Sequence, residues 1–214
     1  MPRMKIPLSG FSPYHVTARC INREWFNVPL AEVWPLMEDY LFFIANAYKL
    51  QIYSFVLMAN HFHLIVKSPN KNLGEAMNYF MRETSRALGK RAGRINQTYG
   101  SRFHRTLLSK DLHFHYAYKY VYRNPVKAGI VEAVENYRYS TLSGLLGKSS
   151  LHIPIPEDPI LFGNRGVENT LKWLNSDPPN KVEDDVKKAM RRGLFKFSSE
   201  KSNKKSSLEQ ELLY

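Results

Sequence analysis

The stretch from residue 51 to residue 68, QIYSFVLMANHFHLIVKS, decides the fold of this chain. It holds two runs rich in strand-forming residues, 51–58 and 61–68, and the short Ala59-Asn60 connection between them suits a tight β-hairpin. Working outward, hydrophobic spacing predicts a strand, a helix, this hairpin, a helix, a strand and a helix, over residues 12–21, 30–49, 51–68, 73–90, 101–108 and 111–124. The order βαββαβα is the signature of a ferredoxin-like α+β sandwich, an antiparallel sheet with helices on one face and the other face free for a ligand.

Individual residues predict where these helices begin and end. Pro35 implies that the first helix starts or bends there. Asn72 can cap the second helix and Gly93 ends it, while Asp111 caps the third.

Two histidines stand on the second strand of the hairpin. Alternate residues of a strand share a face, so Phe62, Leu64 and Val66 face the core. His61 and His63 point the other way, about 7 Å apart along the strand, from where both can bind one metal ion. A His-x-His pair also occurs by chance, but the apolar face behind this one favours a site.

The last predicted helix carries a polar stripe. Spacings of three and four residues place the following on one side of it: His113, Tyr116, Tyr120, Asn124 and Lys127. A tyrosine and a carboxamide one turn apart can meet the same ion or substrate, although the tyrosines would also serve simply to pack the helix. Pro125 disfavours helical geometry at Asn124, which therefore sits at the helix end.

The composition indicates one folded domain with a polyanionic partner. The 214 residues are 43% hydrophobic and 23% charged, and 31 Lys and Arg against 19 Asp and Glu give a net charge of +12. No stretch reaches the roughly 20 apolar residues of a membrane span, and the N-terminus lacks a secretory signal, so we expect a cytoplasmic protein with no membrane partner. The single cysteine, Cys20, excludes an internal disulfide and a multi-cysteine metal cluster.

Most of the excess charge lies between Met81 and Lys127, a segment with eleven Lys and Arg, two acidic residues and a net charge of +9. The rings interleaved with these cations include Tyr99, Phe103, Tyr116, Tyr118, Tyr120 and Tyr122. This mixture suits phosphates and unstacked bases, although a basic helix with aromatic core residues would show the same pattern. Because the segment links the histidine pair to Tyr120, we interpret it as a track that delivers one strand of nucleic acid.

The chain changes character beyond about Leu142. Residues 153–166 are rich in Pro and Gly, short helices are predicted over 167–175 and 182–192, and residues 198–207 have low complexity. We expect a catalytic domain over 1–142, a loop and short-helix extension over 143–197 and a disordered tail over 198–214. The extension would add DNA contacts, regulate access or cover the core.

Two separate motifs carry a resemblance to a known family. The segments MANHFHLIV, from Met58 to Val66, and YVYRNPVKAGIV, from Tyr120 to Val131, resemble the HUH-class single-tyrosine transposases. Within this class they resemble in particular the bacterial repeat-associated tyrosine transposases. The resemblance covers about residues 13–142 and includes YHVTAR at 14–19 and RFHR at 102–105.

The resemblance implies a site and a reaction. In this family a His-hydrophobic-His pair binds a divalent cation, and the nucleophilic tyrosine lies four residues before the Asn of an Asn-Pro pair. The matching residues are His61 and His63 as metal ligands, Asn124 as the third ligand and Tyr120 as the nucleophile. The family points to Mg²⁺ or Mn²⁺, whereas imidazoles generally prefer zinc-like ions. It implies an enzyme that cleaves and joins single-stranded DNA through a 5′-phosphotyrosine intermediate, on hairpins or palindromic repeats.

The remaining assignments follow from the basic segment. We expect DNA contacts from Arg82, Arg86, Arg102, Arg105 and Lys127. Further histidines that would bind metal, touch DNA or pack are His104, His113 and His115. Two other functions stay open: a catalytically silent ferredoxin-like nucleic-acid-binding regulator, and a metal-dependent hydrolase that uses water in place of the tyrosine. The sequence allows a monomer or a homodimer.

Overall fold

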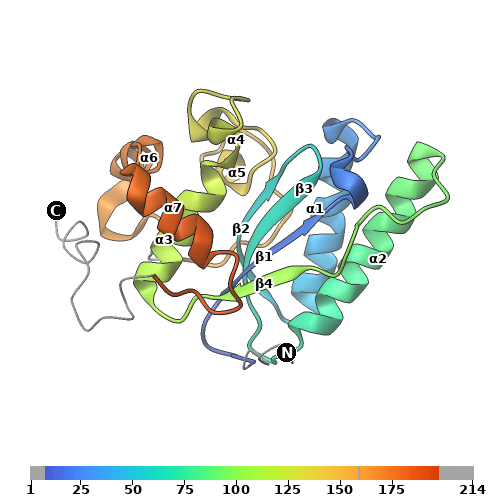
Figure 1. Ribbon diagram of the computed structural model, residues 1–214, viewed down its shortest axis with the longest axis horizontal. Coiled ribbons are helices and arrows are strands. Elements are labelled where there is room, and N and C mark those ends of the chain that lie inside the picture. The colour runs from blue at the N-terminus through green and yellow to red at the C-terminus, as the bar shows by residue number, and fades with distance from the viewer. Residues whose placement is uncertain (1–7, 159, 198–214) are drawn as a thin grey trace.

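The computed structural model describes residues 8–158 and 160–197, and its elements follow the predicted order (Figure 1). One antiparallel sheet has the strand order β2-β3-β1-β4, made of β1 (Tyr14–Arg19), β2 (Gln51–Leu57), β3 (His61–Lys67) and β4 (His104–Leu107). The α-helices are α1 (Leu30–Ala47), α2 (Leu73–Ala92), α3 (Asp111–Tyr122), α4 (Asn124–Lys127), α5 (Thr141–Leu145), α6 (Gly166–Asn175) and α7 (Asn180–Ala189). Short 3-10 turns are η1 (Ile21–Arg23), η2 (Val134–Asn136) and η3 (Gly163–Arg165). The ferredoxin-like α+β prediction is confirmed.

The hairpin and its neighbour β1 set which side chains share a face. The Met58 N–H donates to the carbonyl oxygen of His61 at 2.8 Å and closes the turn between β2 and β3. β1 runs antiparallel to β3, with Arg19 opposite His61 and Thr17 opposite His63. Residues opposite each other in a ladder project from the same face, so these four side chains line one surface of the sheet.

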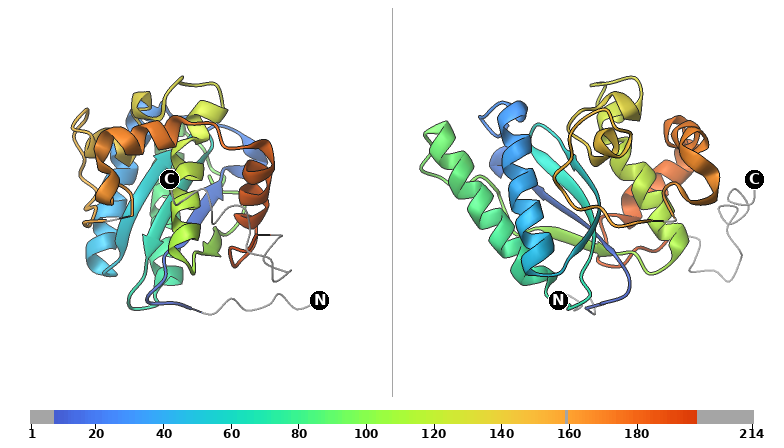
Figure 2. Two further views of the ribbon diagram at one scale, coloured as in Figure 1. Left: turned by 90° about the vertical axis from the view of Figure 1, so that its left-hand side faces the viewer. Right: turned by 180° about the vertical axis from the view of Figure 1, so that it is seen from behind.

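The first two long helices cover the other face of the sheet. α1 and α2 lie together on that side in each view (Figure 2). They bury Phe62, Leu64 and Val66 completely, as the alternation in the sequence predicts. The face that carries the histidine pair therefore points away from α1 and α2.

The helix ends agree only partly with expectation. α1 begins before Pro35 and continues through it, so a start at the proline is wrong. The side chain of Asn72 does not cap α2 but donates to the carbonyl oxygen of Tyr48 at 3.1 Å. Gly93 ends α2 in the left-handed conformation, as predicted. Asp111 is the first helical residue of α3 rather than its cap.

The second face of the sheet is not left free along its whole width, which corrects the prediction. α3 packs over Val56 of β2 and Ile65 of β3, and all three elements share a second hydrophobic cluster. Tyr118 and Val121 contribute fully buried side chains to it. Apolar residues on this face need a cover as much as those on the other, so an open surface is confined to β1, β4 and the end of β3 that bears the histidines.

The segment after residue 142 completes this second cluster. Leu174 of α6 and Val186 of α7 are buried in it, together with Phe195. Beyond α7 the chain returns to the sheet, where the Leu107 N–H donates to Gly193 O at 2.9 Å and the Phe195 N–H donates to Leu107 O at 3.0 Å. These bonds occupy part of the otherwise exposed edge of β4.

The predicted domain boundaries stay a prediction, and the predicted disordered tail lies outside the described residues. Among the helices within residues 8–158 and 160–197, none combines the length and the apolar character needed to cross a membrane.

Candidate active site

The histidine pair occupies the uncovered end of β3. The rings of His61 and His63 lie edge to face with their centroids 5.1 Å apart. His63 is 5% exposed, whereas His61 is half-buried. The spacing of the pair on one strand face brings both imidazoles to the same place, as the sequence predicts.

The hydrogen bonds of the pair leave one ring nitrogen of each histidine without a partner among the described residues. His61 Nδ1 lies 2.7 Å from Asn60 Oδ1, and because a carbonyl oxygen only accepts, Nδ1 carries the proton and Nε2 keeps its lone pair. The Asn60 amide is oriented by its own nitrogen, which donates to Arg23 O at 2.7 Å. His63 Nε2 is buried and makes no hydrogen bond to any described residue.

A third histidine, His15, belongs to the site and was missed from the sequence. Its Nε2 lies 2.9 Å from His63 Nδ1, and the two rings stack with centroids 5.1 Å apart. His15 is 1% exposed. The signal was present, because alternation along β1 puts His15, Thr17 and Arg19 on the face opposite to the buried Tyr14 and Val16.

All three imidazoles are held in the neutral form. Burial lowers the pKa of His61 to about 4 and that of His15 to about 3, with smaller contributions from Arg19 and His104 respectively. Burial also lowers the pKa of His63 well below its ordinary value, assisted by His15 and His61. Neutral imidazole is the form that binds metal ions, so burial prepares these rings as ligands at pH 7.

Tyr120 reaches the histidines of its own chain from α3. Its ring stands edge-on to His63, with centroids 5.6 Å apart, and edge-on to His15 at 6.0 Å. Burial raises the pKa of its hydroxyl, whereas the positive charges of Arg191 and Arg19 lower it. The tyrosine therefore lies beside the pair in a setting where two cations favour its ionised form.

Asn124 follows one turn after Tyr120, where α3 gives way to α4. Its Nδ2 donates to the Tyr120 carbonyl oxygen at 2.7 Å. The same Nδ2 also reaches the Val121 carbonyl oxygen at 3.4 Å, the acceptor that the N–H of a helical residue 125 would use and that Pro125, which has no N–H, leaves open. Since the amide nitrogen is used in this way, Oδ1 is the atom left to face a ligand.

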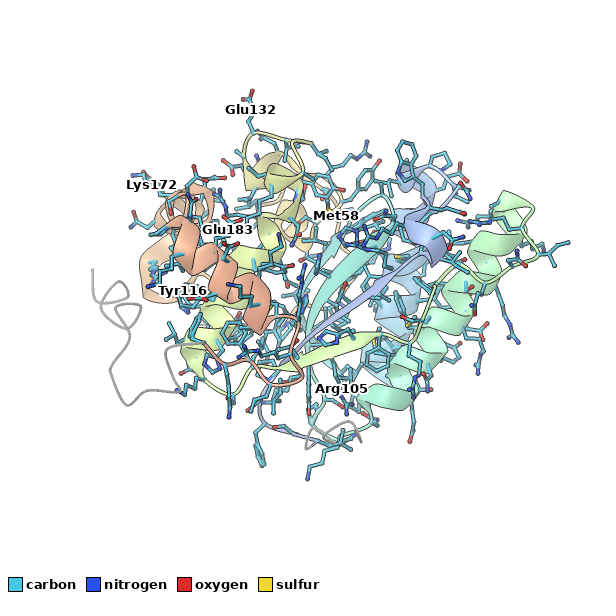
Figure 3. The ribbon with its side chains drawn as sticks, in the orientation of Figure 1. Met58, Arg105, Tyr116, Glu132, Lys172 and Glu183 are labelled. Atoms are coloured by element: carbon cyan, nitrogen blue, oxygen red, sulfur yellow. The ribbon has the colours of Figure 1, made fainter. Side chains whose placement is uncertain are left out.

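These residues line one open cleft of about 620 Å³ between the sheet and α7. Figure 3 labels a residue on either side of it, Met58 after β2 and Glu183 on α7. The cleft is strongly basic, with one carboxylate, that of Glu183, against the cations Arg19, Arg102, Lys127, Lys187 and Arg191. The arrangement can hold an anion next to Tyr120 and the histidine pair.

Comparison with protein families now identifies the chain. The model of the family described as IS200-like transposase matches residues 12–124, which is more than half of the sequence. The matched segment includes the whole first motif and the beginning of the second, from Tyr120 to Asn124. The chain belongs to the IS200-like transposase family. The match confirms the resemblance to single-tyrosine transposases of the HUH class.

A solved structure of a REP-associated tyrosine transposase bound to a REP hairpin is similar to this transposase in fold, with a TM-score of 0.58 and 16% sequence identity. The likeness covers 74% of this chain and 93% of that one. Comparison with curated proteins gave no match.

The donor atoms of the transposase fit a divalent cation. Within the described residues no group of three or more His, Cys, Asp and Glu side chains is placed to hold a metal ion. His61, His63 and the Asn124 carboxamide oxygen are the available set, and the buried His63 Nε2 lacks any other partner among the described residues. Two imidazole nitrogens and one amide oxygen leave positions for water and phosphate oxygens, as Mg²⁺ and Mn²⁺ require.

The predicted DNA contacts fall in different places. Arg102 and Lys127 line the cleft, and Lys127 also pairs with Glu183 at 2.6 Å. Arg105 lies over the ring of Tyr14, apart from the labelled residues of the cleft (Figure 3).

Arg82 and Arg86 lie on α2, on the opposite side of the sheet, and both pair with Glu83. The two arginines are therefore not near the proposed site. The expectation that they contact DNA rested on such nearness. Of the eleven cations between Met81 and Lys127, the cleft receives two.

Most of the rings and the additional histidines of this segment serve packing. Tyr99, Tyr118 and Tyr122 are at most 5% exposed and belong to the two hydrophobic clusters, so the simpler interpretation holds for them. His113 packs on Phe195 with centroids 4.6 Å apart, and His115 packs on Trp173 at 5.2 Å. Among the extra histidines His104 lines the cleft, and among the rings named for this segment Tyr120 does so.

Proposed function

We propose that this transposase cleaves and rejoins single-stranded DNA through a covalent bond between Tyr120 and a 5′ phosphate. The observation that carries the proposal is the position of the Tyr120 ring, 5.6 Å from His63 and in the same basic cleft as His61 and Asn124. A nucleophile, a set of metal-binding atoms and a binding place for phosphate then occupy one site.

The reaction follows from these neighbours. The Tyr120 oxygen attacks phosphorus and loses its proton, the bond from phosphorus to the 3′ oxygen breaks, and that oxygen leaves as a 3′ hydroxyl after taking up a proton. The phosphodiester energy is kept in the tyrosine link, so a second 3′ hydroxyl reverses the step and joins strands without ATP. Arg19 and Arg191 stabilise the phenolate and the phosphate charge as it develops.

The metal would be Mg²⁺ or Mn²⁺, held by His61, His63 and Asn124. When bound, such an ion supplies positive charge to the scissile phosphate and the departing oxygen. The chain itself holds both imidazoles neutral through burial and orients the His61 ring through Asn60, so the ligands are ready before any ion arrives.

Hairpins or palindromic repeats are the proposed substrate. A REP-associated transposase of similar fold is bound to a REP hairpin, and the present cleft is open and basic enough for a strand that leaves such a stem. A single chain supplies both Tyr120 and the histidine pair, which supports catalysis within one monomer.

The test is to incubate the protein with end-labelled hairpin DNA and Mn²⁺ or Mg²⁺ and to look for an adduct that survives denaturation. We expect an adduct with the wild type and none with Tyr120→Phe. Tyr116→Phe is the matched control, because Tyr116 lies one turn earlier on α3 and packs on Phe197 at 5.3 Å.

The other functions predict different results. A silent binding protein would retain hairpins but form no adduct with any variant. If the protein were a hydrolase that uses water, the Tyr120→Phe variant would still cut DNA. Either result would replace the proposal.

A further inference from the structure

One helix of the extension forms a wall of the cleft. Glu183 and Lys187 lie one turn apart on α7 (Asn180–Ala189), and Arg191, four residues further on, stands in the turn just after the helix. All three line the cleft together with Met190. Residues four apart lie on one side of a helix, so this charged stripe faces the sheet across the open space. The cleft therefore depends on a part of the chain that lies beyond the segment matched by the family model, residues 12–124.

The opposite side of α7 is buried, which fixes the stripe in place. Val182, Val186 and Ala189 are at most 9% exposed and belong to the second hydrophobic cluster. α7 contacts α3, the helix that carries Tyr120, and the three views show the two helices side by side (Figure 1; Figure 2). The stripe cannot turn away from the cleft without exposing this apolar side.

Both ends of α7 are also tied to elements of the site. At its start Glu183 pairs with Lys127 of α4 at 2.6 Å. Just after its end, the carbonyl oxygen of Met190 accepts a hydrogen bond of 2.8 Å from the buried hydroxyl of Thr106 on β4. The wall is thus held at two points, and its cations are positioned before any strand binds.

Lys187 and Arg191 are exposed and have no counter-charge among the residues that the structure describes. Neither makes an ion pair or a hydrogen bond with a described residue, whereas Lys127 is occupied by Glu183. Arg191 acts electrostatically on Tyr120, so its charge lies within range of the proposed nucleophile. Two uncompensated cations facing a concave site next to a nucleophile for phosphorus match the backbone of a nucleic acid.

We propose that α7 and the turn that follows it form a DNA-binding wall, on which Lys187 and Arg191 contact backbone phosphates of the single strand that lies against Tyr120. The inference rests on the proposed function for the identity of the strand. Part of the extension then has a direct role in substrate binding. Lys187 and Arg191 take the place of Arg82 and Arg86 on α2 as the expected source of phosphate contacts.

The neighbouring residues provide a built-in control. Lys188 and Arg192 carry the same charges, are equally classed as exposed and stand one position further along, but they do not line the cleft. A general effect of net charge would appear in both pairs of positions, whereas a contact in the cleft would appear in Lys187 and Arg191 alone.

The experiment measures fluorescence anisotropy of a labelled hairpin with a single-stranded extension, over a range of NaCl concentrations and with EDTA present. For K187A/R191A we expect weaker binding and a salt slope, log K against log salt, reduced by about 1.4, since each phosphate contact to a single strand contributes about 0.7. K188A/R192A should keep the wild-type slope. The charge-preserving K187R/R191K should also keep most of it, which separates loss of charge from loss of fold.

Two results would overturn the inference: an unchanged slope in K187A/R191A, or an equal loss in both alanine pairs. Thermal melts of each variant show whether it is folded, and exposed positions should leave the melting temperature unchanged. Because binding without metal needs no reaction at Tyr120, a failed adduct test would refute the proposed function and leave this result standing.

Discussion

Replacing His15 by phenylalanine should weaken metal binding at the histidine pair, although both proposed ligands, His61 and His63, stay in place. A ligand nitrogen must be unprotonated, so metal at His63 Nε2 requires the proton on Nδ1, where it donates to His15 Nε2 at 2.9 Å. Phenylalanine fills the same space but accepts no hydrogen bond. The buried His63 Nδ1–H is then left without a partner in the state that binds metal.

The expected magnitude follows from that lost hydrogen bond. Removing the partner that orients a metal-bound histidine costs about 10- to 100-fold in metal affinity. With metal well above its dissociation constant, stabilisation by the metal falls by about 1.4–2.7 kcal/mol. The change also alters packing, so the metal-free protein itself should lose about 1–3 kcal/mol. The informative quantity is therefore the metal-induced gain measured within each variant.

The assay is urea unfolding with EDTA and with increasing Mn²⁺, for the wild type, His15→Phe and His15→Gln. Glutamine carries a carbonyl oxygen that can accept from His63, so it should recover part of the gain. His152→Phe is the control, because His152 is exposed and lies beside Glu38 of α1, on the far side of the sheet. A metal-induced gain in His15→Phe equal to that of the wild type would refute the reasoning.

Three further predictions concern charge and pH. Arg123 is 4% exposed and donates hydrogen bonds to three backbone carbonyls at the end of α6. Arg123→Met should therefore lower the free energy of unfolding, measured by urea unfolding, by about 2–3 kcal/mol, and a loss within experimental error would contradict a structural role. Glu183→Gln should release Lys127, steepen the salt slope of hairpin binding by about 0.7 and change stability by less than about 1 kcal/mol; a shallower slope would argue against it. With EDTA present, stability should be full above pH 6.5 and fall below it, by up to about 1.4 kcal/mol per pH unit for each of His15 and His63. The reason is that a histidine in the unfolded chain takes up a proton below pH 6.5, whereas these buried rings, whose pKa is lowered, stay unprotonated. A free energy of unfolding that stays constant between pH 7 and pH 5 would contradict their burial.

The sheet and the histidine face were predictable because they depend on local pattern. The hairpin, the alternation around His61 and the left-handed Gly93 each leave a signature within a few residues. The same logic applied to β1 would have found His15, since it alternates with Tyr14 and Val16 in the first strand. That omission was one of interpretation, not of missing signal.

The layout of the charges was not predictable in this way. A helix that follows the hairpin must cover the Phe62 face, so the cations of α2 are carried to the layer away from the histidines. Arg123 stands in the motif next to Asn124 but is used to cap α6, which enters the structure some fifty residues later. The cations form one basic segment in the sequence, but the packing of the helices places them on both faces of the sheet.

The rings of α3 show the same limit. A helix at the surface would expose Tyr118 and Tyr122 to bases, but α3 lies between the sheet and the extension and buries both. Only knowledge of the tertiary partners distinguishes these tyrosines from Tyr120: the Tyr118 hydroxyl bonds to Asp158, and the Tyr122 hydroxyl lies 3.2 Å from that of Thr141. Their spacing along the helix is the same kind of pattern in either case.

Burial acts in opposite directions on the two kinds of group in the cleft. It lowers the pKa of His61 and His63, which keeps them neutral and ready to bind a cation, but it raises the pKa of Tyr120, which makes a nucleophile harder to form. A deeper site would improve the ligands and impair the tyrosine. Arg19 from β1 and Arg191 beyond α7 counter part of this effect, since both lower the pKa of Tyr120, although burial still leaves it raised. The charge of Arg19 also lowers the pKa of His61 and His63, so it keeps them neutral as well. In the proposed reaction, cations on both walls of the cleft therefore serve the metal ligands, the nucleophile and the phosphate together, which gives the segment around α7 a role beside that of the sheet.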